Sequence, residues 1–451
     1  MRTETGMGWE RLTRRRFLQV AAGVGAVSAL PGVRSAAFGS NGAGVWLAGD
    51  FHVHTTYSHD VWGGPGDDNT DTQDAYTFGW TPAEQIQNAT LRGLDFVALT
   101  DHNRTDALFD SGYTSDQLLL VPGYEHSLDG VNGVGGQHCG VFLPHKSDLQ
   151  ALFLSKLATG QEKQLPFSGD DGFLAFTHAI HEAGGMCVIN HPSNTIWQRG
   201  VAASTHADGI EVWNTSFLSR SDTTGLLISS VAADNHRSVN WWETNFLGGT
   251  KRKAAVGGSD NHWRSTFAAQ GVGQPTTWVY ARSRSARDVI RGVQAGRTFV
   301  SAQPPAYGGP RLFLSAAEDW NGGADQPAMV GGTVRSLGAL AVSIRVENGQ
   351  GNWMRLIAGA PSTGGRVVQT DQVTSPDATY VATVVLDRGG WVRAELYVDP
   401  GYAMTALTSP IYADPVATAP NGQQATPTTG PPVTYGSDLT IPSHAALEHS
   451  C

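Results

Sequence analysis

The sequence predicts an α/β fold followed by a small all-β sandwich. Between about residues 45 and 303, short apolar runs of strand length alternate with helical segments, which is typical of parallel βαβ units. From about residue 308, short alternating strands are separated by Gly, Asn and Asp turns, which indicates a β-sandwich. We therefore expect a βα-barrel over residues 45–303 and a sandwich domain over residues 308–413.

The first 37 residues have the features of a twin-arginine export signal. Three arginines within Thr13–Gln19 precede a mild apolar run from Val20 to Leu30, and the small residues at 35–37 suit signal peptidase. The apolar run is too short and too rich in Gly and Ala to span a bilayer stably. We expect the twin-arginine export machinery as a partner, no transmembrane segment in the mature chain, and an extracellular, periplasmic or cell-surface location. A basic, disordered N-terminus is the alternative.

The chain of 451 residues is acidic. Its formal net charge is −10 and becomes −14 when the six Arg and two Glu of residues 1–37 are removed. Because nucleic acids are polyanions, this charge argues against a nucleic-acid partner and leaves a small-molecule substrate. The three cysteines, at positions 139, 187 and 451, cannot form a framework of several disulfides.

The elements of the first domain can be placed in order. A helix begins at Pro82 with Thr81 as its N-cap and extends to Arg92. After it we expect strands over residues 94–100, 118–124, 139–143, 186–190, 209–214, 254–259 and 298–300, and helices over 173–183, about 221–247 and 285–295.

The second domain is expected to consist of strands alone. The alternating runs cover residues 311–314, 339–346, 353–357, 380–386 and 391–398. Residues 414–451 are rich in Pro, Thr and Gly and are expected to form a disordered tail.

Metal-binding side chains recur where the strands of the first domain begin or end. His52 and His54 are two residues apart, so in an extended chain they point to the same side. The carboxyl ends of barrel strands converge on one face, where sites are built. Imidazole and carboxylate ligands without a Cys suit zinc, manganese or iron. The candidate ligands are His52, His54, His59 or Asp60, His102, Glu125, His138, His191, Asp260 and His262.

Five segments in order resemble the motifs of the PHP (polymerase and histidinol phosphatase) superfamily. They are residues 50–58, 99–103, 123–125, 188–192 and 258–262. The resemblance covers about residues 45–300 and implies a distorted seven-stranded (β/α)7 barrel of PHP type with two or three divalent metal ions. An exported form with a C-terminal sandwich is similar to the branch that includes carbamate-hydrolysing metallohydrolases.

The resemblance also implies ligand roles. His52, His54, Glu125 and Asp260 would hold one ion, and Glu125 with His138 and His191 would hold a second. His102, His262 and either His59 or Asp60 would hold a third. Many members of the superfamily have Asp directly after Ser, whereas His59 is inserted between Ser58 and Asp60 here. The choice between these two ligands therefore stays open.

These residues predict a metal-dependent hydrolase. The hypothesis is that a metal-bridging hydroxide is the nucleophile, with His52, His54, Glu125, His191 and Asp260 as the catalytic centre. Phosphoesters are the expected substrates, and carbamates or carboxyl esters are the alternative within the same site. A non-catalytic cell-surface binding protein is the alternative outside the enzymes.

Several further residues near the motifs are candidates for other roles. Asn103, Asn214, Arg199 and Arg264 flank the motifs and are candidates for substrate binding. Glu211 also ends a strand but matches no ligand role. His178 and His181 have a helical spacing that could hold a metal, although a position in mid-helix favours packing or solvent exposure.

Overall fold

The structure is a computed structural model that describes 13 separate segments and one single residue. They are residues 44–58, 79–128, 137–157, 169–192, 197, 200–214, 227–248, 252–262, 271–318, 327–336, 339–360, 364–386, 389–398 and 404–415. The predicted signal peptide of residues 1–37 and the predicted tail from residue 416 onward lie outside these residues. Among the described helices, none has both the length and the apolar character of a bilayer span.

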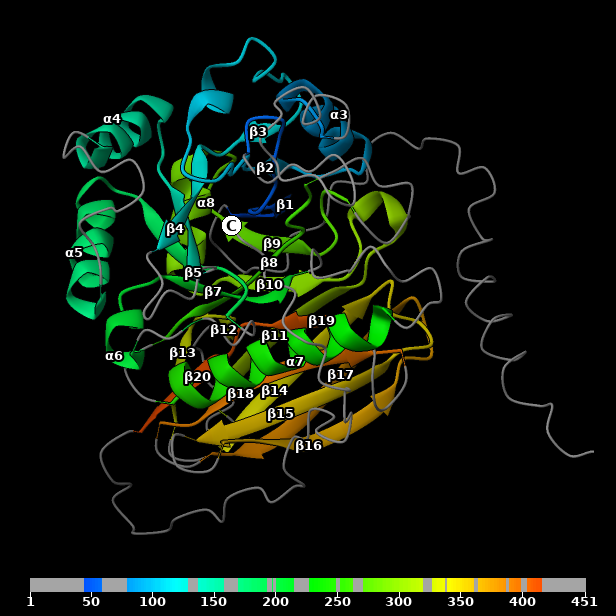
Figure 1. Ribbon diagram of the computed structural model, residues 1–451. Coiled ribbons are helices and arrows are strands. Elements are labelled where there is room, and N and C mark those ends of the chain that lie inside the picture. Colours follow the sequence, from blue (N-terminus) through cyan, green and yellow to red (C-terminus); the bar gives the residue numbers. More distant parts are fainter. Residues whose placement is uncertain are drawn as a thin grey trace, which may run out of the picture. The chain divides into compact units, whose positions relative to one another are not determined.

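The described elements form a mixed α/β fold, as the sequence predicts (Figure 1). Their strands make three sheets. The five-stranded sheet has the order β4 (Gly123–Leu128), β5 (Gln137–Phe142), β6 (Met186–Ile189), β7 (Gly209–Asn214) and β8 (Ala254–Gly258). The four-stranded sheet has the order β12 (Ala328–Met329), β11 (Arg311–Glu318), β14 (Ala339–Glu347) and β17 (Asp377–Val385).

The third sheet has eleven strands and runs through both parts of the chain. Its order is β13 (Thr333–Ser336), β20 (Ile411–Pro415), β18 (Trp391–Tyr397), β19 (Met404–Thr408), β10 (Thr298–Ser301), β9 (Thr276–Ala281), β1 (Val45–Asp50), β2 (Phe96–Val97) and β3 (Leu119–Leu120). Off this path, β15 (Trp353–Ala360) pairs with β18 and with β16 (Gly364–Gln372).

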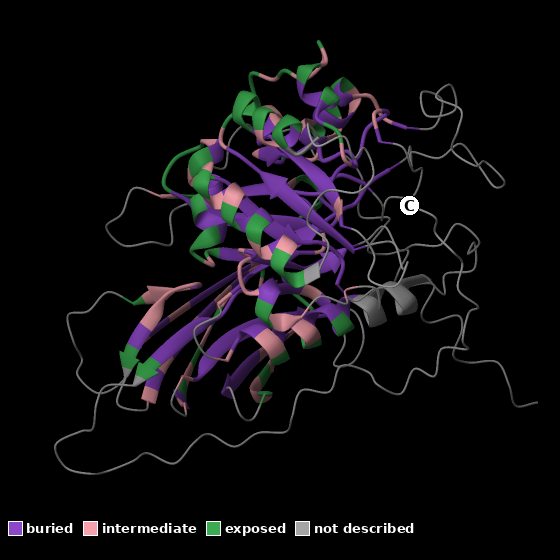
Figure 2. Cartoon of the chain, turned by 60° about the vertical axis from the view of Figure 1, so that its left-hand side comes forward, coloured by how far each residue is buried: buried purple, intermediate pink, exposed green. Residues whose placement is uncertain are grey.

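The helices lie between the strands in sequence. They are α3 (Pro82–Leu91), α4 (Lys146–Leu157), α5 (Gly169–Glu182), α6 (Val201–Ser204), α7 (Leu227–Phe246) and α8 (Ala286–Gln294), and short 3-10 helices cover Asp106–Phe109 and Pro305–Tyr307. Figure 2 shows that the strands are largely buried, whereas exposed residues gather on helices and turns.

The expectation of uniformly parallel βαβ units is only partly right. β1, β2 and β3 are parallel to one another, as are β6, β7 and β8. However, β5 is antiparallel to both β4 and β6, and β9 is antiparallel to β1 and β10. Only residues 129–136 connect β4 to β5, and a parallel crossover needs a dozen or more residues. This short connection explains the antiparallel pair.

The β1–β2–β3 strands and the five-stranded sheet share an apolar layer. Phe51 and Phe96 pack with Phe142, Val188 and Val256 in one buried cluster. Two isolated parallel bridges join the sheets, one between Val53 and Asn261 and one between His102 and Glu125. Closure of these strands into a distorted seven-stranded barrel stays a prediction.

The strands from residue 311 onward lie in two sheets that share a core, and we call them the sandwich strands. β14 alternates between half-buried and buried residues along its whole length, the pattern of a strand with one face in a core. Leu312, Val342 and Ile344 of the four-stranded sheet share a core with Met354 and Leu356 of β15. The sequence analysis did not predict β12, β13, β16, β19 or β20. The division of the chain near residues 303–308 stays a prediction.

Helix α3 begins where the sequence predicts because its first turn is capped. The Thr81 hydroxyl accepts a hydrogen bond from Glu84 N at 3.3 Å, and the Glu84 carboxylate accepts one from Thr81 N at 2.9 Å. This reciprocal capping box satisfies two backbone donors that a helix start would otherwise leave open.

We expect Thr81→Ala to lower the free energy of unfolding by about 1 kcal/mol, because the N-cap acceptor is lost. Thr90→Ala is the matched control, since the Thr90 hydroxyl donates only to Ile86 O of the same helix in the contacts seen. Denaturant titration of both variants measures the difference, and an equal loss in the two would contradict the capping argument.

A buried ionic network joins α7 to the eleven-stranded sheet. Arg393 donates to Glu243 Oε2 of α7 at 2.6 Å and also pairs with Glu395, and the Tyr397 hydroxyl donates to Glu395 at 2.8 Å. Burial alone would raise the pKa of the Glu395 carboxyl, but Arg393 and Tyr397 hold this pKa below its usual value of 4.5.

This network predicts an acid-dependent loss of stability. Because the pKa of Glu395 is lower in the folded state, the unfolded chain takes up the proton first as pH falls. The stabilisation by Glu395 is therefore present above about pH 4.5 and is lost as pH falls through the folded-state pKa. We expect Glu395→Gln to reduce the slope of unfolding free energy against pH in acid, measured by denaturant titration. An unchanged slope would show that Glu395 does not contribute.

Candidate metal centre

His52 and His54 follow β1 and face the same two carboxylates. His52 Nε2 lies 3.0 Å from Glu125 Oε2 and 3.2 Å from Asp260 Oδ1. His54 Nε2 lies 3.2 Å and 3.0 Å from the same two oxygens. All four side chains are buried. The structure thus brings together the four residues that the sequence assigns to a first metal ion.

Glu125 faces different imidazoles with its two oxygens. Besides His52 and His54, Oε2 lies 3.3 Å from His102 Nε2. Oε1 lies 3.2 Å from His138 Nδ1 and 3.3 Å from His191 Nε2. The carboxylate thus stands between two sets of candidate ligands.

The position of Glu125 within its strand differs from the prediction. It is not at a strand end but is the third residue of β4, because Pro122 separates β3 from β4. Proline has no N–H to give to a ladder, so the predicted run of residues 118–124 is divided there.

His262 completes the group on the side of Asp260. Its Nδ1 lies 3.3 Å from Asp260 Oδ1, and its ring stacks on His54 with centroids 3.9 Å apart. The rings of His54 and His102 are 4.9 Å apart, and those of His102 and His138 are 4.6 Å apart. Every predicted ligand among the described residues therefore lies in one cluster, which we call the metal centre: His52, His54, His102, Glu125, His138, His191, Asp260 and His262.

Three residues at the centre adopt left-handed backbone conformations. The φ angles are 48° for Asn103, 30° for His191 and 50° for Asp260. Non-glycine residues pay for such conformations, which cluster at functional sites and need surrounding contacts to hold them. Asp260 N donates to His52 O at 2.7 Å, and Asn103 N donates to Glu125 O at 2.8 Å.

Of the substrate-binding residues predicted from the sequence, only some are among the described residues. Asn103 Oδ1 accepts from Ser127 N at 3.0 Å, so this side chain braces β4. A contact between Asn103 and substrate stays a prediction. Arg199 and Arg264 lie outside the described residues, as do the alternative ligands His59 and Asp60.

Glu211, for which the sequence analysis predicts no ligand role, joins several parts of the centre. Glu211 Oε1 lies 2.9 Å from His52 Nδ1. Its Oε2 accepts from His191 N at 2.8 Å and from Asn214 Nδ2 at 3.0 Å. A Cβ atom on Gly258 would lie 2.3 Å from Glu211 Oε1, so the glycine gives the carboxylate its place. In the sequence, the one sign of a role for Glu211 was its position in the expected strand of residues 209–214.

The Nδ1 atoms of the first two histidines have partners away from the centre. His52 Nδ1 faces Glu211, and His54 Nδ1 lies 3.0 Å from Ser58 Oγ. Such partners fix the ring orientation of a metal-binding imidazole. The Nε2 atoms of both rings are consequently directed at the carboxylates.

Charge is strongly coupled across the centre. Burial alone would raise the pKa of Glu125, but His52, His102 and His138 hold it well below its usual range. His52 shows the opposite balance: burial lowers its pKa, but the carboxylates of Asp260, Glu125 and Glu211 raise it well above the usual value.

Asp260 follows the pattern of Glu125. Burial would raise its pKa, and His52, His262 and His54 hold it well below the usual range. Both carboxylates of the centre therefore favour the ionised form, which is the form that binds metal.

The donor set fits divalent ions. Three groups have ligand atoms within 4.8 Å of one another: His52, His54, Glu125 and Asp260; His102, Glu125 and His138; and His54, His102 and His262. The first group matches the expected set, whereas His102 replaces His191 in the second. His138 is buried, yet no described residue forms a hydrogen bond with its Nε2. A buried imidazole nitrogen of this kind suits a metal ion.

The other histidine pair considered from the sequence does not belong to the centre. His181 Nε2 bonds to Asp208 Oδ2 at 2.9 Å, and the exposed His178 lies beside His206 with ring centroids 5.1 Å apart. In the three clusters formed by described residues, neither His178 nor His181 takes part.

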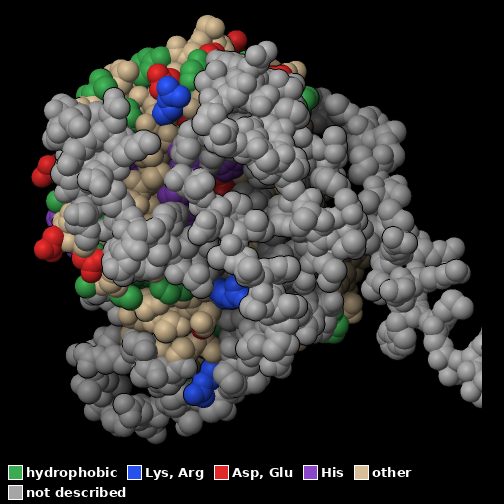
Figure 3. All heavy atoms as spheres, viewed as in Figure 1, with side chains coloured by type: hydrophobic (Ala, Val, Ile, Leu, Met, Phe, Trp, Pro, Cys, Tyr) green, Lys and Arg blue, Asp and Glu red, His purple; other side chains and the backbone are tan. Residues whose placement is uncertain are grey.

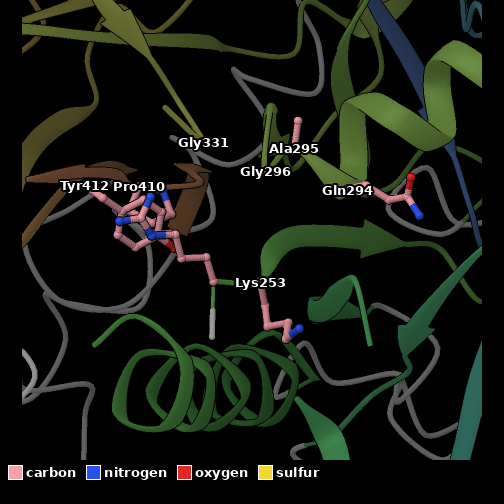
Figure 4. A pocket seen from close by; sticks show the side chains of 8 residues that line it. Lys253, Gln294, Ala295, Gly296, Gly331, Pro410 and Tyr412 are labelled. Atoms are coloured by element: carbon pink, nitrogen blue, oxygen red, sulfur yellow. The ribbon is translucent and has the colours of Figure 1, made fainter. Parts of the chain in front are cut away.

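Figure 3 shows histidine and acidic side chains next to one another on this face of the molecule. A separate cavity of about 190 Å³ is lined by residues that include Arg252, Lys253, Gln294 and Tyr412 (Figure 4). Arg252 bonds to Asp414 at 3.0 Å and Lys253 donates to Thr205 O, so both cations are engaged by the protein itself.

Comparison with known proteins gives structural similarities only. No protein-family model and no curated protein matches the chain. The chain is similar to a two-domain protein from Bacteroides vulgatus that contains a predicted PHP-like metal-dependent phosphoesterase, with 15% identity, a TM-score of 0.37, and coverage of 82% of this chain and 95% of the other.

Two further structures are similar over a smaller part of this chain. One is a protein from Bifidobacterium adolescentis predicted to be a metal-dependent phosphoesterase, with 18% identity, a TM-score of 0.27, and coverage of 54% of this chain and 94% of the other. The other is an amidohydrolase from Chromobacterium violaceum with bound sulfate and no metal, with 18% identity, a TM-score of 0.27, and coverage of 47% and 86%. These similarities assign no activity to this chain.

The contacts of Glu211 lead to a prediction about metal affinity. Glu211→Gln replaces one oxygen by an NH2 group, so either His52 Nδ1 or His191 N loses its acceptor. We expect affinity for Zn²⁺ or Mn²⁺ to fall about 10- to 100-fold in competition with a chelator. Glu182→Gln, an exposed change on α5, is the control. Equal affinities in the two variants would show that Glu211 does not orient the ligands.

Proposed function

We propose that this protein is an exported metal-dependent hydrolase of PHP type that cleaves phosphoesters. The observation that carries the proposal is the position of Glu125. Its two oxygens face two different sets of imidazoles at 3.0–3.3 Å, in a buried cluster that also contains Asp260. A carboxylate between two sets of donors can be shared by two neighbouring ions, which supports a site for two metal ions.

If the residues of the metal centre hold two divalent ions, these would lower the pKa of a water molecule toward about 7 and would offset negative charge on the attacked phosphoryl or acyl oxygen. Zinc, manganese and iron all suit this mixture of imidazole and carboxylate donors.

The residues of the chain hold and orient these groups. His52 and His54 offer Nε2 because Glu211 and Ser58 occupy their Nδ1 atoms. Asn190 Nδ2 donates to Glu125 Oε1 at 2.8 Å and so limits the rotation of the shared carboxylate. With the ligands held in advance, little reorganisation is needed when substrate binds.

The choice of substrate depends on positive charge near the centre. Arg104 follows His102 by two residues, and its half-exposed guanidinium donates to Tyr57 O at 3.4 Å. It is a candidate contact for a phosphate group, as are Arg199 and Arg264. However, Arg104 Nε also bonds to Asp106 at 3.2 Å, which offsets its charge. This ion pair favours the second candidate, hydrolysis of an uncharged carbamate or carboxyl ester by the same water.

A double variant tests the proposed function. We expect His52→Ala/His54→Ala to lose bound metal and at least about 100-fold in turnover, because two of the four ligands in one group are removed. The measurements are metal content by elemental analysis and turnover of p-nitrophenyl phosphate, bis-p-nitrophenyl phosphate and a naphthyl carbamate.

His178→Ala is the matched control, because this histidine is exposed on α5 outside the metal centre. Preference for a phosphate ester over the carbamate supports phosphoester hydrolysis, and the reverse preference supports the second candidate. Metal-free wild-type protein, or unchanged turnover in the double variant, overturns the hydrolase and favours a non-catalytic binding protein.

A further inference from the structure

Hydrogen bonds link helix α7 to the metal centre from outside. They run through Asn235 of α7 and Asn214 of β7. Asn235 Oδ1 accepts from Asn214 N at 2.9 Å. The Asn214 side chain then donates from Nδ2 to Glu211 Oε2 at 3.0 Å and to Asp260 Oδ2 at 3.1 Å. All four side chains are buried. Two bonds thus lead from α7 to a carboxylate of the centre.

The position of Asn214 in the sheet lets its side chain donate hydrogen bonds to both carboxylates. It is the last residue of β7, next to β8, which leads into Asp260. An amide NH2 has two hydrogens, so one side chain can donate to two acceptors. Asp260 has a left-handed backbone with a φ of 50°, a conformation that persists only where neighbours hold it.

The other side of α7 is fixed by the sandwich strands. Glu243 Oε1 accepts from Gly365 N of β16 at 2.7 Å, and its Oε2 accepts from Arg393 of β18 at 2.6 Å. Trp242 Nε1 donates to Lys253 O at 3.0 Å. Figure 1 shows α7 running beside these strands.

Apolar packing strengthens the same contact. Val239, Trp242 and Phe246 of α7 are fully buried in a cluster that also contains Ile357 and Trp391 of the sandwich strands. A close-packed interior transmits a displacement of one element to its neighbours. The same cluster contains Ile210 and Val212 of β7, so β7 and the sandwich together set the position of α7 and hence of Asn235.

We propose that Asn214 and Asn235 are positioning residues for metal binding, through which α7 and the sandwich strands hold Asp260 and Glu211 in place. The inference gives the sandwich a role in the metal centre. It depends on the proposed metal centre, and its test therefore measures metal affinity and not only turnover.

The first test compares asparagines of the same helix. Asn235→Ala removes the acceptor for Asn214 N, whereas Asn235→Asp keeps an acceptor oxygen at that place. Asn245→Ala is the control, because the Asn245 side chain donates to Trp241 O within α7. We expect affinity for Zn²⁺, measured by competition with a chelator, to fall about tenfold in Asn235→Ala and to stay within about twofold of wild type in the other two variants.

The second test reaches the sandwich itself. Glu243→Gln keeps the shape of the side chain but removes its charge opposite Arg393. We expect the affinity for Zn²⁺ to fall further than in the Asn245→Ala control, in the same direction as in Asn235→Ala. Thermal unfolding of every variant separates this effect from general destabilisation, since a structural role alone lowers the melting temperature without changing the affinity of the folded protein.

The outcomes distinguish this inference from the proposed function. If wild type binds zinc and Asn235→Ala binds it equally well, the positioning pair is overturned and the hydrolase stands. If Asn235→Ala loses affinity but Glu243→Gln does not, the role of the sandwich is overturned. If wild type binds no metal, both the inference and the proposed function fail.

Discussion

The metal centre depends on a carboxylate that is completely buried. Removing Glu125 from water costs several kcal/mol unless opposite charge or strong hydrogen bonds replace the lost solvation. Five imidazoles and the Asn190 amide surround its two oxygens. The low pKa of Glu125 and the high pKa of His52 are two expressions of this one interaction.

Several features of the fold serve this arrangement. β4 enters the five-stranded sheet antiparallel to β5, which puts Glu125 opposite Gly140, a residue without a side chain. His52 arrives from β1 in another sheet, and the bridge between His102 and Glu125 joins the two edges. Ligands that are far apart in the sequence meet at this junction of the two sheets.

The sequence predicts those features that depend on neighbouring residues. Thr81, Pro82 and Glu84 define the start of α3, and the alternation of β14 defines a strand with one buried face. The candidate ligands were predicted because His, Asp and Glu recur beside the expected strands, and their roles because five segments resemble PHP motifs. Each of these signals lies within a few residues of the element that it describes.

Features that depend on distant residues were missed. Glu211 looked like an ordinary strand residue, since its partners His52 and His191 come from other strands. In the sequence, Gly258 looks like any other small residue of a buried strand. The structure shows that Glu211 and His52 fill the space that a side chain at position 258 would need. The direction of β5 likewise follows from the length of a connection, and the residues of the strand itself do not reveal it.

The eleven-stranded sheet means that the two parts of the chain are joined by main-chain hydrogen bonds. β10 pairs with β9 on one side and with β19 on the other, through Phe299 with Thr408 and Ser301 with Ala406. A chain cut between β10 and β11 would leave the backbone donors and acceptors on one side of β10 open along a new sheet edge, the kind of edge that recruits other chains. The later strands therefore also protect the first part of the chain against association with other molecules.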